Sequence, residues 1–212
     1  MASNLAPIEQ IGIAIMAKAP MPGLTKTRLI SALGTEGAAE LQRTMILRTV
    51  ATALEAGIGS VSVWCGPDTQ HRLFQDIASK HPVQLHEQSA GDLGDRMHAA
   101  FVAATAVSPT LLIGVDCPTM APAHLRRCGE CLCRGDDAVF LPAEDGGYVL
   151  VGLWRPQARL FKNIEWGGST VMAVTRERLR QLNLIWSEPE KLWDLDRPDD
   201  LQRWKAISNN AT

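Results

Sequence analysis

Short apolar runs alternate with longer amphipathic stretches along this chain. The run IGIAIM at positions 11–16 is typical of a buried strand, and residues 37–56 carry apolar positions at helical spacing up to Gly57, which favours a helix end. By the same patterns we expect strands at 11–16, 61–65, 83–86, 111–115, 138–141, 148–153 and 184–186. Helices are expected at 37–56, 68–79, 95–107, 121–133, 169–182 and 198–207, with Asp68 or Thr69 capping the second of them.

Strands that alternate with helices predict an α/β fold, with a parallel or mostly parallel sheet covered by helices on both faces. No repeat, low-complexity tract or linker divides the sequence, so we expect a single domain over residues 1–212, with 1–8 and 208–212 flexible. Ligands of open α/β sheets bind at the carboxyl ends of the strands. Polar motifs that directly follow a strand are therefore the candidates for function.

Composition narrows the kind of ligand. Hydrophobic residues make up 46% of the 212 residues, charged ones 21%, and the formal net charge is −2. This balance provides no large basic field, so nucleic acid is not expected as a partner, whereas a small phosphate ligand fits a local site. The first ten residues contain no Lys or Arg, and no apolar stretch reaches the roughly 20 residues of a membrane span. Five cysteines without a secretion signal predict reduced thiols and a cytoplasmic location, while the oligomeric state stays open.

The loop after the first strand, residues 17–27, is a candidate phosphate site. Gly23 and two prolines shape it, and Lys18, Lys26 and the next-following Arg28 supply positive charge. Backbone amides in such a loop can surround a phosphate while the cations neutralise it. The spacing of a Walker A motif is absent, and the alternative interpretation is a solvated basic turn.

A second motif, QSAGDLGDRM, covers positions 88–97. Gly91 and Gly94 permit close approach of the backbone to a ligand. Asp92 or Asp95 equally fits a helix N-cap, which is a purely structural role.

Asp116 follows the fourth strand within GVDCP, at positions 114–118. A carboxylate at the end of a strand is well placed to hold Mg²⁺ or Mn²⁺ against a diphosphate, and we favour this interpretation over a helix cap.

Two further acidic motifs follow later strands. Asp145 stands beside a Gly-Gly pair, where it either contacts an acceptor or the metal, or belongs to a simple hairpin turn. In WDLDRPDDL, at positions 193–201, Asp194 and Asp196 precede the last helix and could face the crevice of the sheet. Asp196 is the candidate second metal ligand, while Asp199 and Asp200 suit the N-terminal end of the helix dipole.

Five segments together resemble one protein family. They are APMPGLTKTRL (19–29), GDLGDRM (91–97), GVDCP (114–118), DGGYVLVGL (145–153) and DLDRPDDL (194–201). In this order they are similar to the bacterial DUF2064 group, described as glycosyltransferase-like or as radical-SAM/selenodomain-associated transferases. That group belongs to the nucleotide-diphospho-sugar transferase superfamily, so the resemblance implies a Rossmann-like GT-A fold and a nucleotide substrate.

The resemblance also implies roles for individual positions. Lys18, Gly23, Lys26 and Arg28 would hold the nucleotide phosphates, and Gln88, Gly91, Asp92 and Leu93 would lie near the base or ribose. Asp116 and Asp196 would bind Mg²⁺ or Mn²⁺. From their motifs, Asp116 and Asp145 are our candidate catalytic residues. Arg197 stands where related nucleotidyltransferases carry Thr, which places a cation next to the metal site.

Three functions are compatible with these motifs. The first is metal-dependent transfer from a nucleotide-diphospho-sugar to a small-molecule acceptor. The second is nucleotidyl transfer from a nucleoside triphosphate to a phosphorylated small molecule, because the first loop is also similar to that of phospholactate guanylyltransferases. The third is nucleotide binding without catalysis. The sequence names neither the base, the sugar nor the acceptor.

Overall fold

The computed structural model describes residues 8–209. The expectation that the chain ends are flexible falls mostly outside this range, at residues 1–7 and 210–212. Ile8 begins the short helix η1 (Ile8–Gln10), and residues 208–209 belong to the last turn of α6 (Asp200–Asn209). Among the described residues, no helix is both long and apolar enough to cross a membrane.

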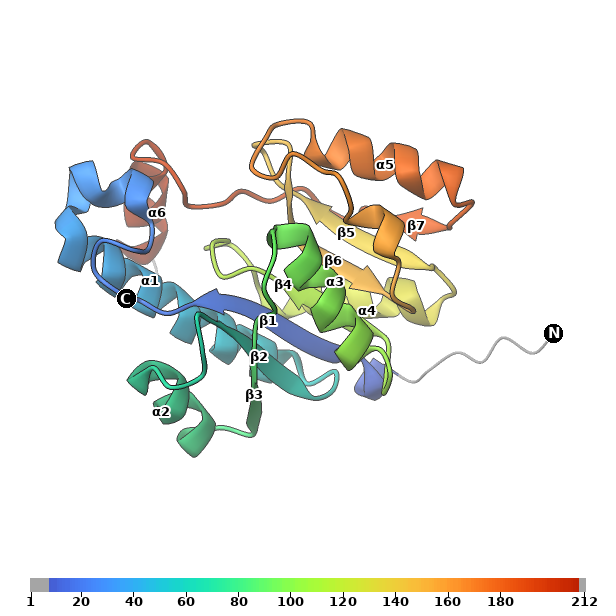
Figure 1. Ribbon diagram of the computed structural model, residues 1–212, viewed down its shortest axis with the longest axis horizontal. Coiled ribbons are helices and arrows are strands. Elements are labelled where there is room, and N and C mark those ends of the chain that lie inside the picture. The colour runs from blue at the N-terminus through green and yellow to red at the C-terminus, as the bar shows by residue number, and fades with distance from the viewer. Residues whose placement is uncertain (1–7, 210–212) are drawn as a thin grey trace.

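Seven strands form one mixed sheet in the order β3-β2-β1-β4-β6-β5-β7 (Figure 1). Only β6 among these strands runs antiparallel to its neighbours, β4 and β5, which confirms the expected α/β class with a mostly parallel sheet. The strands are β1 (Gly12–Lys18), β2 (Val61–Gly66), β3 (Val83–Glu87), β4 (Thr110–Ile113), β5 (Ala138–Pro142), β6 (Tyr148–Leu153) and β7 (Trp186–Ser187).

Helices cover both faces of the sheet (Figure 1). The remaining helices are η2 (Thr27–Leu29), α1 (Ile30–Ala56), α2 (Arg72–Lys80), α3 (Leu93–Ala104), α4 (Pro122–Cys133), η3 (Ala158–Leu160) and α5 (Val171–Gln181). Buried residues of α1, α2 and α4 pack in one core cluster, and those of α3 and α5 pack in another. Alternate residues of β1 enter the two clusters, Ile13 and Ile15 on one side and Ala14 on the other. A strand buried on both faces has to be apolar throughout, which explains the run IGIAIM.

The starts of helices α1 and α2 differ from the sequence-based expectation. Helix α1 begins before Gly34, which interrupts it with φ 71°, so the pattern recovered only the part after this kink. The cap of α2 is His71, whose side chain accepts from the Leu73 amide, and the expected cap at Asp68 or Thr69 is wrong. Asp68 instead accepts from the Gln70 amide and forms a local turn.

The antiparallel strand β6 brings three chain segments to one edge of the sheet. The residue pairs Ile113↔Leu150 and Pro142↔Tyr148 place the start of β6 beside the ends of β4 and β5. The carboxyl ends of β1, β4 and β5 therefore share a rim with the 143–147 turn. The polar motifs that follow these strands are thereby brought together.

Candidate active site

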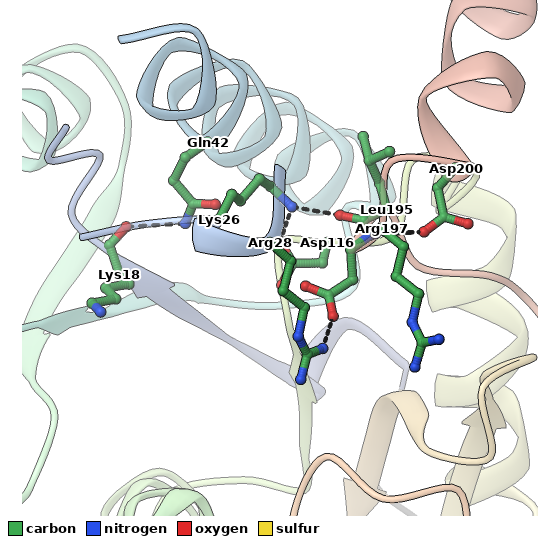
Figure 2. A network of polar contacts seen from close by, with 9 residues as sticks. Lys18, Lys26, Arg28, Gln42, Asp116, Leu195, Arg197 and Asp200 are labelled. Carbon is green, nitrogen blue, oxygen red and sulfur yellow. Dashed lines mark hydrogen bonds and ion pairs between the residues drawn. The ribbon is translucent and has the colours of Figure 1, made fainter. Parts of the chain in front are cut away.

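Lys26 links the first loop to the acidic motifs on the far side of the site (Figure 2). Its Nζ donates to Asp116 Oδ1 and to the carbonyl oxygen of Leu195, each at 2.7 Å. The Lys26 side chain is 4% exposed, whereas that of Asp116 is 49% exposed. A buried ammonium needs such partners, because desolvation without them is costly. The structure therefore brings together residues that lie 90 and 169 positions apart in the chain.

The other residues of the first loop lie in different places. Arg28, in η2, forms an ion pair with Asp196. Lys18 ends β1, and its Nζ donates to the carbonyl oxygen of Leu24 at 2.7 Å. The Lys18 side chain lies apart from Asp116 (Figure 2). Gly23 is exposed and has φ 76°, so it shapes the turn through its backbone. Of the four loop residues predicted to hold phosphate, the structure places only Lys26 and Arg28 at the carboxylates.

Backbone hydrogen bonds of two leucines anchor the acidic segment 192–196 at the rim of the sheet. The Leu192 amide donates to the Pro142 carbonyl at 2.9 Å, and the Leu195 amide donates to the Asp116 carbonyl at 2.7 Å. The Leu195 side chain is fully buried in the cluster that joins α1 and α6. These anchors leave Asp194 and Asp196 on the wall of the cavity described below.

Asp194 lies in an electrostatically unfavourable position. Burial, and then the charges of Asp145, Asp196 and Asp116, raise its pKa from 3.8 to about 6, although a backbone hydrogen bond opposes the shift. The negative charge of these carboxylates exceeds what Lys26 and Arg28 neutralise. Such an excess is typical of a site that receives a cation.

Asp145 occupies the tip of the β5–β6 hairpin. Its Oδ1 accepts from the Gly147 amide at 2.8 Å, and the Gly147 carbonyl accepts from the Ala143 amide at 2.9 Å. The hairpin interpretation of this motif is therefore correct. The turn also places Asp145 on the cavity wall, so the two interpretations of the motif are compatible.

The 88–97 motif forms the start of α3. Asp92 caps the helix in a capping box with Asp95, which makes the expected helix start at residue 95 too late. A Cβ at Gly91, where φ is 109°, would lie 2.5 Å from the Asp95 carboxylate, so the box requires glycine there.

Gln88 connects this motif to the sheet. Its amide nitrogen donates to the carbonyls of Trp64 and Ala17, and its oxygen accepts from Arg96. Leu93 is the one residue of the predicted base or ribose set that also lines the cavity. The contacts of Gln88 and Asp92 are structural, and their nucleotide contacts stay predictions.

A cavity of about 370 Å³ opens between these carboxylates and the face of the sheet that α3 and α5 cover. Its acidic residues are Asp116, Asp145, Asp194 and Asp196, and Arg28 is the single cationic residue among the described lining residues. Larger apolar and aromatic side chains form much of the remaining wall: Met16, Leu93, Met97, Leu112, Val115, Tyr148, Val149, Val151, Trp166 and Val171.

The carboxylate oxygens of this site fit a hard divalent cation that binds together with a nucleotide. Carboxylate oxygens are suitable ligands for Mg²⁺ and Mn²⁺. Within residues 8–209, no three acidic, His or Cys side chains are grouped closely enough to hold an ion alone. Mg²⁺ is commonly bound by one or two carboxylates plus substrate phosphates, so Asp116 and Asp196 would suffice when a nucleotide supplies the other oxygens.

Sequence reasoning left the role of Asp194 open and missed the aromatic wall. The signal for Asp194 is the alternation Asp-Leu-Asp, because a buried leucine between two acidic residues of an extended segment leaves both carboxylates on the opposite side. Trp166 lies in the irregular segment between η3 and α5, where periodicity gives no information.

Comparisons with known proteins identify the family. The model of a family described as "Uncharacterized protein conserved in bacteria (DUF2064)" matches residues 49–168, which confirms the resemblance. No curated protein matches the chain.

Solved structures support the same assignment. A proposed nucleotide-diphospho-sugar transferase from Desulfovibrio desulfuricans G20 is 27% identical, with 89% of this chain and 83% of that chain covered and a TM-score of 0.79. A nucleotidyl transferase from Methanothermobacter thermautotrophicus is 17% identical, with 95% and 99% covered and a TM-score of 0.63. Rv0371c of Mycobacterium tuberculosis H37Rv, solved in complex with manganese, is 17% identical, with 92% and 97% covered and a TM-score of 0.53. The latter two likenesses concern the fold alone.

The chain therefore belongs to the DUF2064 family, and its likeness to a proposed nucleotide-diphospho-sugar transferase supports assigning it to the transferases.

Proposed function

We propose that this protein is a metal-dependent transferase that takes a nucleotide-diphospho-sugar as donor and a small molecule as acceptor. The observation that carries the proposal is the convergence of Asp116, Asp194 and Asp196 with Arg28 on the wall of one cavity, where Lys26 pairs with Asp116 from behind the lining residues. Transfer from such a donor releases a nucleoside diphosphate, so the site has to stabilise negative charge that develops on the leaving group. The likeness to nucleotide-using transferases is consistent with this chemistry.

Asp116 and Asp196 are the proposed metal ligands. A divalent ion bound there would neutralise the negative charge of the diphosphate. Asp116 is half exposed and only its Oδ1 is paired with Lys26, so an oxygen is left for an incoming cation. A structure related in fold was solved with manganese, which is consistent with this choice of ion.

Lys26 and Arg28 are the proposed phosphate ligands. Both are paired with carboxylates in the ligand-free protein, Lys26 with Asp116 and Arg28 with Asp196. When a cation neutralises these carboxylates, each basic side chain becomes available to a phosphate oxygen. This exchange of partners predicts that metal and nucleotide bind cooperatively.

Asp145 and Asp194 are the proposed groups that act on the acceptor. Burial raises the pKa of Asp194 to about 6, which is closer to the pH range in which a general base works best. Asp145 is held by the Gly147 amide and faces the same cavity. Either carboxylate would accept a proton from an acceptor hydroxyl as the new bond forms.

A binding screen followed by turnover assays tests the proposal. Nucleoside diphosphates, triphosphates and nucleotide-sugars are each added with Mn²⁺ while the melting temperature is followed. We expect a rise with a diphosphate and a nucleotide-sugar that share one base, and release of the diphosphate from that nucleotide-sugar. Release of pyrophosphate from a triphosphate would assign nucleotidyl transfer instead. Binding without turnover of any donor would leave a non-catalytic nucleotide-binding protein.

A further inference from the structure

Arg203 of α6 binds two segments of the candidate active site at once. Its guanidinium donates to both carboxylate oxygens of Glu144, from Nη1 to Oε2 at 2.8 Å and from Nη2 to Oε1 at 3.2 Å. Its Cζ also lies 4.3 Å from the centroid of the Trp193 ring. A two-pronged ion pair and a cation–π contact fix the orientation of a guanidinium as well as its position. Arg203 therefore joins the β5–β6 hairpin to the acidic segment 192–196.

Both contacts fall beside the two carboxylates that we propose act on the acceptor. Glu144 directly precedes Asp145, and Trp193 directly precedes Asp194. Among the described residues, the last backbone hydrogen bond between the two segments runs from the Glu144 amide to the Leu192 carbonyl, at 3.0 Å. Both carboxylates lie beyond that bond, where the guanidinium bridges the two segments.

Asp145 and Asp194 carry like charges and lie close enough to interact. Both line the main cavity and also a smaller cleft, of about 90 Å³, which Arg203 lines with them. After burial, the charge of Asp145 contributes most to the raised pKa of Asp194. Two such carboxylates move apart unless other contacts hold the segments that carry them. The bridge made by Arg203 is placed to oppose this repulsion.

We propose that Arg203 is a positioning residue, which keeps Asp145 and Asp194 together at the cavity by holding Glu144 and Trp193. Its effect on catalysis rests on the proposed function, because these two carboxylates are the ones assigned to the acceptor. Its effect on the geometry of the hairpin does not depend on that function. Arg203 is about half exposed, so its replacement opens no cavity in the core.

Amide hydrogen exchange in the ligand-free protein, measured by NMR, tests the geometric part. Arg203→Met removes the charge and keeps a long unbranched side chain. The reporters are the amides of Glu144 and Gly147, which both donate hydrogen bonds in the hairpin. We expect both to exchange about tenfold faster in this variant, while amides in the middle of α6 change by less than about twofold. Arg203→Lys, which keeps a cation near Trp193 but has no fork for the carboxylate, should give a smaller acceleration.

A matched control and a rescue separate positioning from a general loosening of α6. Arg48, in α1, lies over a different ring of α6, that of Trp204, at 5.7 Å. Arg48→Met should therefore leave the hairpin amides within about twofold of the wild type. Asp145→Asn, added to Arg203→Met, should return the exchange of the Glu144 amide to within about threefold of the wild type, because the repulsion is gone.

Turnover tests the catalytic part. With a nucleotide-sugar that the wild type uses, Arg203→Met should lower kcat about tenfold or more, because displaced catalytic groups lose their alignment. The Kd of the nucleoside diphosphate with Mn²⁺ should stay within about twofold, since the proposed metal and phosphate ligands are outside the bridge. Arg203→Lys should recover part of kcat, and Arg48→Met should keep it within about twofold.

The inference would be overturned by hairpin exchange that Arg203→Met leaves unchanged, that Arg48→Met accelerates equally, or that Asp145→Asn does not restore. An unchanged kcat, or a loss of kcat with an equal loss of nucleotide affinity, would also overturn it. The proposed function fails separately: if no nucleotide-sugar is turned over while exchange behaves as expected, the positioning role is supported and the assigned reaction is wrong.

Discussion

Replacing Asp194 with asparagine should stabilise the ligand-free protein at high pH. The pKa of this carboxyl group rises from 3.8 to about 6 in the folded chain, chiefly through burial and then through Asp145. Between these two pKa values the folded protein binds more protons than the unfolded one, so its stability falls as pH rises. The loss is absent below pH 3.8 and complete above about pH 6.

The size of the effect follows from the shift. A difference of roughly two pKa units corresponds to about 3 kcal/mol, at about 1.4 kcal/mol per unit. Asp194 is only partly buried, and solvent screening reduces this figure to about 1–3 kcal/mol. Asp194→Asn removes the penalty, so the variant should be more stable than the wild type by about this amount at pH 8, and equally stable at pH 4.

Urea unfolding followed by tryptophan fluorescence, in buffer with EDTA, measures this difference at both pH values. Asp199→Asn is the matched control, because Asp199 is exposed in the same segment and its replacement should change stability by less than about 0.5 kcal/mol. A difference between the Asp194 variant and the wild type that does not depend on pH, or a variant that is less stable at pH 8, would refute the electrostatic reasoning.

Three further substitutions test the site. Lys26→Met should destabilise the protein by roughly 1–3 kcal/mol in urea unfolding, since the Leu195 carbonyl and Asp116 lose their donor. It should also weaken nucleotide binding in calorimetry with Mn²⁺; nucleotide affinity equal to the wild type would remove Lys26 from the site. Leu195→Ala should lower the free energy of unfolding by about 2–5 kcal/mol, because it opens a cavity under the acidic segment. Ile185→Ala, at an exposed position, should lower it much less, and equal effects would contradict the anchoring role of Leu195. Arg28→Gln should leave stability within about 0.5 kcal/mol, because its ion pair with Asp196 is exposed, but should lower nucleotide affinity; unchanged affinity would exclude Arg28 as a phosphate ligand.

Much of the fold was predictable because its signals are local. The strand at 148–153 was predicted with the bounds that the structure has, since an apolar run between turn residues is complete in itself. Helix starts were less predictable because caps compete. His71 rather than Asp68 caps α2, and Gly34 hides the first turns of α1.

The candidate site was predictable only in part. The rule that ligands lie at strand ends identified Lys26, Asp116 and Asp196, which the structure brings together. It did not distinguish Lys18, whose ammonium binds the Leu24 carbonyl instead. It also gave no indication of Trp166, because contacts made by an irregular segment depend on the tertiary fold.

Binding of Mn²⁺ in the presence of a nucleoside diphosphate tests the central claim most directly, and electron paramagnetic resonance measures it through the signal of free Mn²⁺. We predict that the wild-type protein lowers this signal beyond the effect of the nucleotide alone, and that Asp116→Asn and Asp196→Asn each abolish the additional decrease. Both variants keep an oxygen at the position of the carboxylate, so their melting temperatures serve as the control for folding. A decrease that is equally large in both folded variants would contradict the assignment of these carboxylates to the metal.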